Sequence, residues 1–181
     1  LMFDYVVLGG GIVGVSTALS LITKHPDKRI LLVEKEESFA QHQTGHNSGV
    51  IHAGVYYEPG SLKAKFCREG LTETIKFCLL HKIPYQQCGK LLVATNDTEL
   101  KRMKELYERC KSNDIEVEIL NEKTLNEIEP HISGIGALLV KSTGIVNYKL
   151  ITKKMSEQFE SLGGMFLLNT KIINLKEDED K

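Results

Sequence analysis

Hydrophobic and polar positions follow two periods along this chain, and together they predict an α/β protein. Short apolar runs rich in β-branched and aromatic residues occupy 3–8 (FDYVVL) and 29–35 (RILLVEK), as expected for buried strands. Between them, residues 12–23 place small and apolar side chains at helical spacing. Residues 25–27 (HPD) end that helix, because proline lacks the amide that the next turn needs. The chain therefore opens with a β-α-β unit.

The rest of the chain continues to alternate between the two periods. Helices are expected at 61–82, 97–114, 121–130 and 148–164, and strands within 85–95, 116–120, 136–147 and 165–175. Ser61 is the candidate N-cap of the first of these helices and Asp97 or Thr98 that of the second, while glycine ends the fourth. The helix at 61–82 is expected to turn an apolar stripe inward: Leu62, Phe66, Leu71, Ile75, Phe77 and Leu79.

This order of elements predicts two interleaved domains. The opening β-α-β unit and the last helix and strand form one nucleotide-binding sheet, at residues 1–83 and 146–181. Residues 84–145 form an inserted α+β domain with a partly antiparallel sheet, which would contact the substrate. The charged tail, 176–181, is expected to be solvated.

A glycine-rich turn joins the first strand to the first helix. Gly9, Gly11 and Gly14 have G-x-G-x-x-G spacing, and Glu34 ends the second strand about twenty residues later. In this setting the glycines allow a tight turn, a close approach to a pyrophosphate and close helix–strand packing, while the acid accepts hydrogen bonds from a ribose. The pattern predicts a Rossmann-like dinucleotide site and disfavours NADP, although the neighbouring Lys35 weakens that last argument. The pattern does not distinguish NAD from FAD as the ligand. The alternative is a glycine-rich turn that packs the helix without binding any ligand.

Composition narrows the class of protein without identifying it. The 181 residues carry a net charge of −1 and are 41% apolar, which fits a globular protein with no general attraction to nucleic acid. No run approaches the roughly 20 apolar residues of a membrane helix, and no signal peptide is visible, so a cytoplasmic location is expected. Neither a zinc motif nor a C-x-x-C pair occurs, so the four cysteines are expected to be reduced and no metal is predicted.

Residues 43–60 (QTGHNSGVIHAGVYYEPG) are unusual, because they crowd rings and amides among glycines. Glycine lets the backbone approach a flat or phosphorylated ligand closely. The candidate ligand-binding side chains are Thr44, His46, Asn47, Ser48, His52, Tyr56 and Tyr57. Such a segment suits the ribityl chain and ring edge of a flavin better than a packed core.

With these motifs in place, the sequence resembles the L-2-hydroxyglutarate dehydrogenase/oxidase family of FAD-dependent, D-amino-acid-oxidase-like oxidoreductases. The resemblance covers the whole chain and rests on GGGIVG, LLVEKE, HQTGHNSGVIHAGVYYEPGSLKAKFCREG, CGKLLVAT, EIEP and STGIVNY. It implies FAD as cofactor and oxidation of an L-2-hydroxy acid, chiefly L-2-hydroxyglutarate to 2-oxoglutarate. It also implies electron transfer to oxygen or a membrane quinone, hence a peripheral membrane contact, and a mitochondrial location in a eukaryote.

The resemblance also implies roles for individual residues. The glycine turn, Glu34 and Lys35 fall at the adenine dinucleotide, and Thr44, Gly45, Asn47 and Ser48 fall where related flavoproteins hold the cofactor from its second side. His52 falls near the flavin ring, and covalent attachment of the flavin there stays open. Family members are considerably longer, so the chain is expected to be an N-terminal portion that lacks a C-terminal half, and whether it is active or inactive alone stays open.

Oxidising a secondary alcohol requires a base for the hydroxyl proton and groups that hold the carboxylates. His52 is the first candidate for the base and His46 the second, although either ring could instead bond to backbone or cofactor. Tyr56, Tyr57 and Lys90 are candidates for lining a substrate pocket, with simple packing as the alternative. Two other functions stay open: an amine, amino acid or glycerol 3-phosphate oxidoreductase of the same fold, and a non-catalytic nucleotide-binding module.

Overall fold

A computed structural model describes residues 2–177 of the chain. The residues divide into two compact units, Leu1–Ser48 with Asn147–Lys181, and Gly49–Val146. In the part described, no helix is long and apolar enough to cross a membrane.

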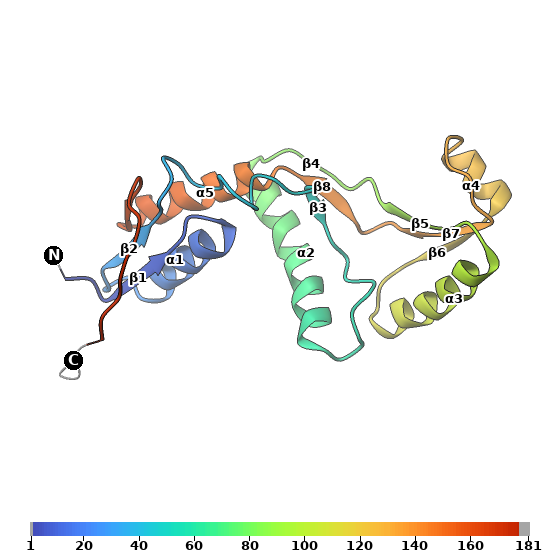
Figure 1. Cartoon of the computed structure of the whole chain (residues 1–181), viewed down its shortest axis with the longest axis horizontal. Coiled ribbons are helices and arrows are strands. Elements are labelled where there is room, and N and C mark those ends of the chain that lie inside the picture. Colours follow the sequence, from blue (N-terminus) through green and yellow to red (C-terminus); the bar gives the residue numbers. More distant parts are fainter. Residues whose placement is uncertain (1, 178–181) are drawn as a thin grey trace. The chain divides into compact units, whose positions relative to one another are not determined.

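The first unit is a β-α-β fold with one added helix and strand (Figure 1). Its elements are β1 (Tyr5–Leu8), α1 (Ile12–Lys24), β2 (Ile30–Val33), α5 (Tyr148–Ser161) and β9 (Met165–Leu167). The three strands form a parallel sheet in the order β1-β2-β9, with Leu8 opposite Val33 and Val33 opposite Leu167. The glycine turn and Glu34 therefore both follow the carboxyl ends of neighbouring strands, where α/β sheets bind ligands.

Helices α1 and α5 cover one face of this sheet. The buried cluster between them consists of Val15, Ala18, Ile22, Ile30, Leu32 and Phe159, with Val7 and Phe166 packed at its margin. Alternate residues of a strand point to opposite faces, so the register places a second apolar row on the other side of the sheet: Val6, Leu8, Leu31, Val33, Met165 and Leu167. We call this side of the sheet the open face, because Val6 is 51%, Leu8 46% and Leu167 49% exposed, although Leu31 and Val33 of the central strand are buried. A hollow of about 410 Å³ adjoins it, lined by Phe3, Leu31 and Met165 among others.

The second unit contains two antiparallel sheets and three helices among its described residues (Figure 1). Its elements are β3 (Val50–Ile51), α2 (Leu62–His81), β4 (Tyr85–Gln86), β5 (Lys90–Ala94), α3 (Asp97–Ser112), β6 (Glu118–Asn121), α4 (Glu122–Ile128), β7 (Gly136–Val140) and β8 (Gly144–Val146). The strand orders are β3-β8-β4 and β5-β7-β6. Helix α3 packs Met103 and Cys110 against the second sheet, where they meet Leu138 and Val140.

The structure confirms the predicted elements and changes some of their ends. Ser61 caps α2, its hydroxyl accepting the Ala64 amide at 3.2 Å, and Gly163 follows the end of α5 in the left-handed region at φ 91°. The prediction for α3 was wrong by one residue, because Asn96 accepts the Glu99 amide and is the N-cap. The strand expected at 165–175 ends at Leu167. Of the predicted tail, 178–181 lies outside the described residues.

Two other expectations differ from the structure. The stripe predicted for α2 is not buried as a whole, since Leu62, Phe66 and Leu79 are more than 60% exposed and Cys78 is the helix's buried residue. The compact units group 49–83 with the middle of the chain, whereas the sequence grouped these residues with the nucleotide-binding part. Which functional role each unit has stays a prediction.

Candidate functional site

The turn between β1 and α1 depends on glycine at two points. Gly9 has φ 105°, a conformation that side chains other than glycine rarely adopt. A Cβ atom on Gly14 would collide with the carbonyl oxygen of Gly9, so α1 rests directly on the turn. These are the tight turn and the close helix–strand contact that a dinucleotide fold requires.

The amino end of α1 is available to an anion. Its N-cap, Gly11, has no side chain to accept the first helical amides. Thr44 takes one of them, since its Oγ1 accepts the Ile12 amide at 3.0 Å. Val13, in the first turn, is 76% exposed. Free amides and the helix dipole together favour a phosphate at such a helix end.

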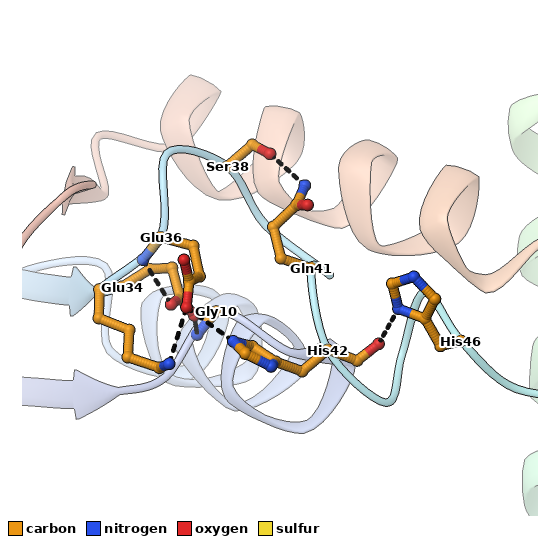
Figure 2. Close-up of polar contacts among 8 residues, drawn as sticks. Gly10, Glu34, Glu36, Ser38, Gln41, His42 and His46 are labelled. Atoms are coloured by element: carbon orange, nitrogen blue, oxygen red, sulfur yellow. Dashed lines mark hydrogen bonds and ion pairs between the residues drawn. The ribbon is translucent and has the colours of Figure 1, made fainter.

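Glu34 is the buried acid at the end of β2. Its Oε2 accepts the Gly10 amide at 2.5 Å and its Oε1 accepts the Glu36 amide at 2.9 Å, as Figure 2 shows. The side chain is 7% exposed. These two backbone donors hold the carboxylate beside the glycine turn, and each oxygen keeps acceptor capacity for a ribose hydroxyl.

Residues after Glu34 form a polar cluster of their own (Figure 2). Glu36 Oε1 lies 2.7 Å from Lys35 Nζ and 2.8 Å from His42 Nε2, and the His46 ring bonds to the His42 carbonyl at 3.0 Å. The hydrogen bond from Lys35, and after it that from His42, lowers the pKa of the Glu36 carboxyl. The hydrogen bond between Lys35 and Glu36 also raises the pKa of the Lys35 ammonium. Lys35 and His46 therefore have partners within this segment, and their predicted roles at a ligand stay predictions.

The segment 44–48 folds as a tight turn in the first unit. The Asn47 amide donates to the carbonyls of Gln43 at 3.1 Å and Thr44 at 2.7 Å. A Cβ on Gly45 would strike the Ala40 carbonyl and the Lys149 side chain. Ser48 is exposed. Thr44 thus joins the α1 terminus directly, while Asn47 shapes the turn.

The remaining predicted residues come together in the second unit. His52, Tyr56, Tyr57 and Lys90 line one shallow hollow, with Thr143 and residues 53–55 completing it. The Lys90 ammonium lies 5.1 Å from the centroid of the Tyr56 ring. Over residues 2–177, the His52 ring has no protein hydrogen-bond partner, so both of its nitrogens are available.

Helices α2 and α3 hold the loop that carries these side chains, a support that sequence reasoning missed. Cys67 donates to the His52 carbonyl at 3.3 Å, Arg109 to the Tyr56 carbonyl at 3.3 Å and Asn113 to the Tyr57 carbonyl at 2.8 Å. Burial raises the pKa of the Cys67 thiol, which favours the protonated donor. The Asn113 side chain is 8% exposed. All three contacts are to backbone carbonyls, so residue type in the loop gave no signal for them.

Comparison with known families decides the class. The model of the FAD dependent oxidoreductase family matches residues 4–181. The chain belongs to that family. It is 52% identical over 179 residues to L-2-hydroxyglutarate dehydrogenase of Escherichia coli K12, covering 99% of this chain and 42% of that protein. It is 47% identical over 161 residues to the mitochondrial L-2-hydroxyglutarate dehydrogenase of Mus musculus, covering 88% of this chain and 35% of that protein.

Solved structures agree on the fold. L-α-glycerophosphate oxidase from Mycoplasma pneumoniae, with FAD bound, superposes with a TM-score of 0.89 at 26% identity, over 98% of this chain and 47% of that one. Glycine oxidase from Bacillus cereus superposes with a TM-score of 0.85 at 23% identity, over 99% of this chain and 50% of that one. The chain thus spans less than half the length of the curated relatives given above. The family uses FAD, and the glycine turn, α1 terminus and Glu34 fit the dinucleotide part of that cofactor.

Proposed function

We propose that this chain takes part in the FAD-dependent oxidation of an L-2-hydroxy acid, with L-2-hydroxyglutarate as substrate and 2-oxoglutarate as product. The observation that carries the proposal is the 52% identity, across nearly the whole chain, to a protein named L-2-hydroxyglutarate dehydrogenase. Electrons would pass through the flavin to oxygen or a quinone. By the names of the relatives, the location would be the mitochondrion in a eukaryote, and we expect the cytoplasm otherwise.

The first unit would hold the cofactor. The open end of α1 and the glycine turn suit the pyrophosphate, and Glu34 suits the adenosine ribose. Gly45, Asn47 and Ser48 would support the turn through which Thr44 reaches α1, and Lys35 would lie at its outer side. Bound FAD would supply the acceptor for the two electrons that leave the alcohol.

The second unit would supply the proton acceptor. Oxidation of a secondary alcohol releases the hydroxyl proton together with two electrons and the proton of the C–H bond. His52 would take the hydroxyl proton on a free ring nitrogen, since imidazole is the side chain best suited to that task near neutral pH. Tyr56 and Tyr57 would flank the substrate and limit its contact with water.

The test is reduction of flavin by substrate in the absence of oxygen, with and without the substitution His52→Asn. Bound oxidised flavin absorbs near about 450 nm and bleaches when it accepts electrons. We expect His52→Asn to retain FAD and to slow bleaching by about 10²- to 10⁴-fold, the usual contribution of a general base. His131→Asn is the matched control, because His131 is exposed and is not among the residues that line the hollow.

Two outcomes would contradict this proposal. Equal bleaching rates for His52→Asn and the unsubstituted chain would remove His52 from the reaction. Faster bleaching by glycerol 3-phosphate or an amino acid than by L-2-hydroxyglutarate would favour one of these alternative substrates. Of the two, glycerol 3-phosphate has structural support, because the fold is similar to that of L-α-glycerophosphate oxidase. A colourless chain that takes up no FAD would instead support a non-catalytic module.

A further inference from the structure

The side chains that line the hollow of the second unit include a cation and no anion. Its lining contains one lysine, one histidine, two tyrosines and a threonine, and no acidic side chain. Arg109 adds a further cation close by, through its bond to the Tyr56 carbonyl. A small pocket with cationic and hydroxyl groups and no carboxylate attracts anions.

Lys90 is the centre of this positive charge. It begins β5, is half-buried and, within residues 2–177, forms no ion pair with an acid. The nearby Lys141 differs, because it pairs with Glu118 at 2.8 Å. In place of an acid, Lys90 has the Tyr56 ring, 5.1 Å from its ammonium. A ring face steadies a cation while leaving its N–H donors free for an anion.

We infer that Lys90, steadied by Tyr56, binds the carboxylate of the substrate that is remote from the reacting carbon, and so selects dicarboxylic over monocarboxylic 2-hydroxy acids. The inference rests on the proposed function, and it names the residue that sets the substrate class. The enclosed part of the hollow measures about 30 Å³, so the remote carboxylate would enter beside half-buried Lys90, while the reacting end of the acid would lie against the exposed His52 and Tyr57 side chains of the same lining.

Binding of product-like acids tests this without turnover. The probes are 2-oxoglutarate, which ends in a second carboxylate, and 2-oxovalerate, which has a methyl group in its place. Each acid is titrated by calorimetry into the FAD-loaded and the FAD-free chain. We expect the unsubstituted chain to prefer 2-oxoglutarate by about 10- to 100-fold, the equivalent of one charge-assisted hydrogen bond. Lys90→Met should reduce this preference to within about threefold, and Lys90→Arg should keep most of it.

The control is Lys104→Met, which removes an exposed lysine of α3 outside the hollow and should leave both affinities unchanged. The inference is overturned if Lys90→Met weakens both acids equally, because Lys90 would then hold the carboxylate next to the reacting carbon. It is also overturned if neither acid binds, or if glycerol 3-phosphate binds more tightly than 2-oxoglutarate in a Lys90-dependent way. If L-2-hydroxyglutarate does not bleach the flavin but the chain still prefers 2-oxoglutarate over 2-oxovalerate, the result contradicts the proposed function and leaves the role of Lys90 standing.

Discussion

The substitution Gly14→Ala tests whether α1 needs direct contact with the glycine turn. The added methyl group would collide with the carbonyl oxygen of Gly9, and the side chain of Val7 lies 3.7 Å from the same point. The Gly9 carbonyl belongs to a backbone turn with a positive φ, so it cannot move aside as a flexible side chain would. Relief therefore requires α1 to shift away from β1.

The expected magnitude follows from two opposing terms. Alanine is favoured over glycine inside a helix by about 1 kcal/mol. Overpacking against a fixed backbone costs about 1–3 kcal/mol and occasionally more. The balance for Gly14→Ala is a net loss of up to about 2 kcal/mol, equivalent to a fall of up to about 1 M in the urea midpoint at a typical slope of about 2 kcal/mol/M.

Gly70→Ala is the matched control, because Gly70 also lies inside a helix and an added Cβ would meet no atom within 4 Å. The free energy of unfolding of Gly70→Ala should exceed that of the unsubstituted chain by up to about 1 kcal/mol. The assay is urea unfolding followed by circular dichroism, with FAD affinity measured on the same samples, and we expect Gly14→Ala to weaken FAD binding as well. A Gly14→Ala chain as stable as Gly70→Ala, with unchanged FAD affinity, would refute the close-packing argument.

Two further substitutions test the supporting contacts. The folded-state pKa of Glu36 is lowered, so its stabilising contribution is present above its ordinary value of 4.5 and is lost as the pH falls through the lower folded value. The difference in urea midpoint between Glu36→Gln and the unsubstituted chain should therefore persist above pH 4.5 and shrink as the pH falls below that value. A constant difference would contradict the pairing of Glu36 with Lys35 and His42. Asn113→Ala removes the donor to the Tyr57 carbonyl and should cost about 1–3 kcal/mol, whereas a loss no larger than that of Ser112→Ala, on the exposed side of α3, would show that this bond does not hold the loop.

The sequence predicted the first unit well, because its signals are local. A β-branched run, glycines at fixed spacing and an acid at the end of the next strand all lie within 3–34, and the structure confirms this β-α-β unit. The α3 cap was missed although its signal was present: Glu99 follows Asn96 at the spacing of a capping box, and its Oε2 accepts the amide of Thr95, the residue before the cap, at 2.8 Å. Two neighbouring cap-forming residues, Asp97 and Thr98, obscured it.

The second unit was harder to predict, because its organisation depends on contacts between distant segments. The carbonyls of Tyr56 and Tyr57 are held by residues more than fifty positions away, Arg109 in α3 and Asn113 at its C-cap. Hydrophobic periodicity also misjudged α2, since a helix can carry apolar residues on more than one side without burying each of them. The grouping of His52 with Lys90 follows from the same long-range folding, and the sequence offered only the residue types.

The open face of the first sheet affects how the chain behaves at high concentration. A parallel sheet is normally covered on both sides. Within residues 2–177, this one leaves Val6, Leu8, Met165 and Leu167 of its edge strands β1 and β9 in contact with water, while Leu31 and Val33 of the central strand are buried. Surfaces of that kind drive molecules to associate, so light scattering and apparent melting temperature should both depend on how much protein is loaded. Mild detergent or a charged substitution at Val6 is therefore a practical aid to keeping the chain monodisperse during purification.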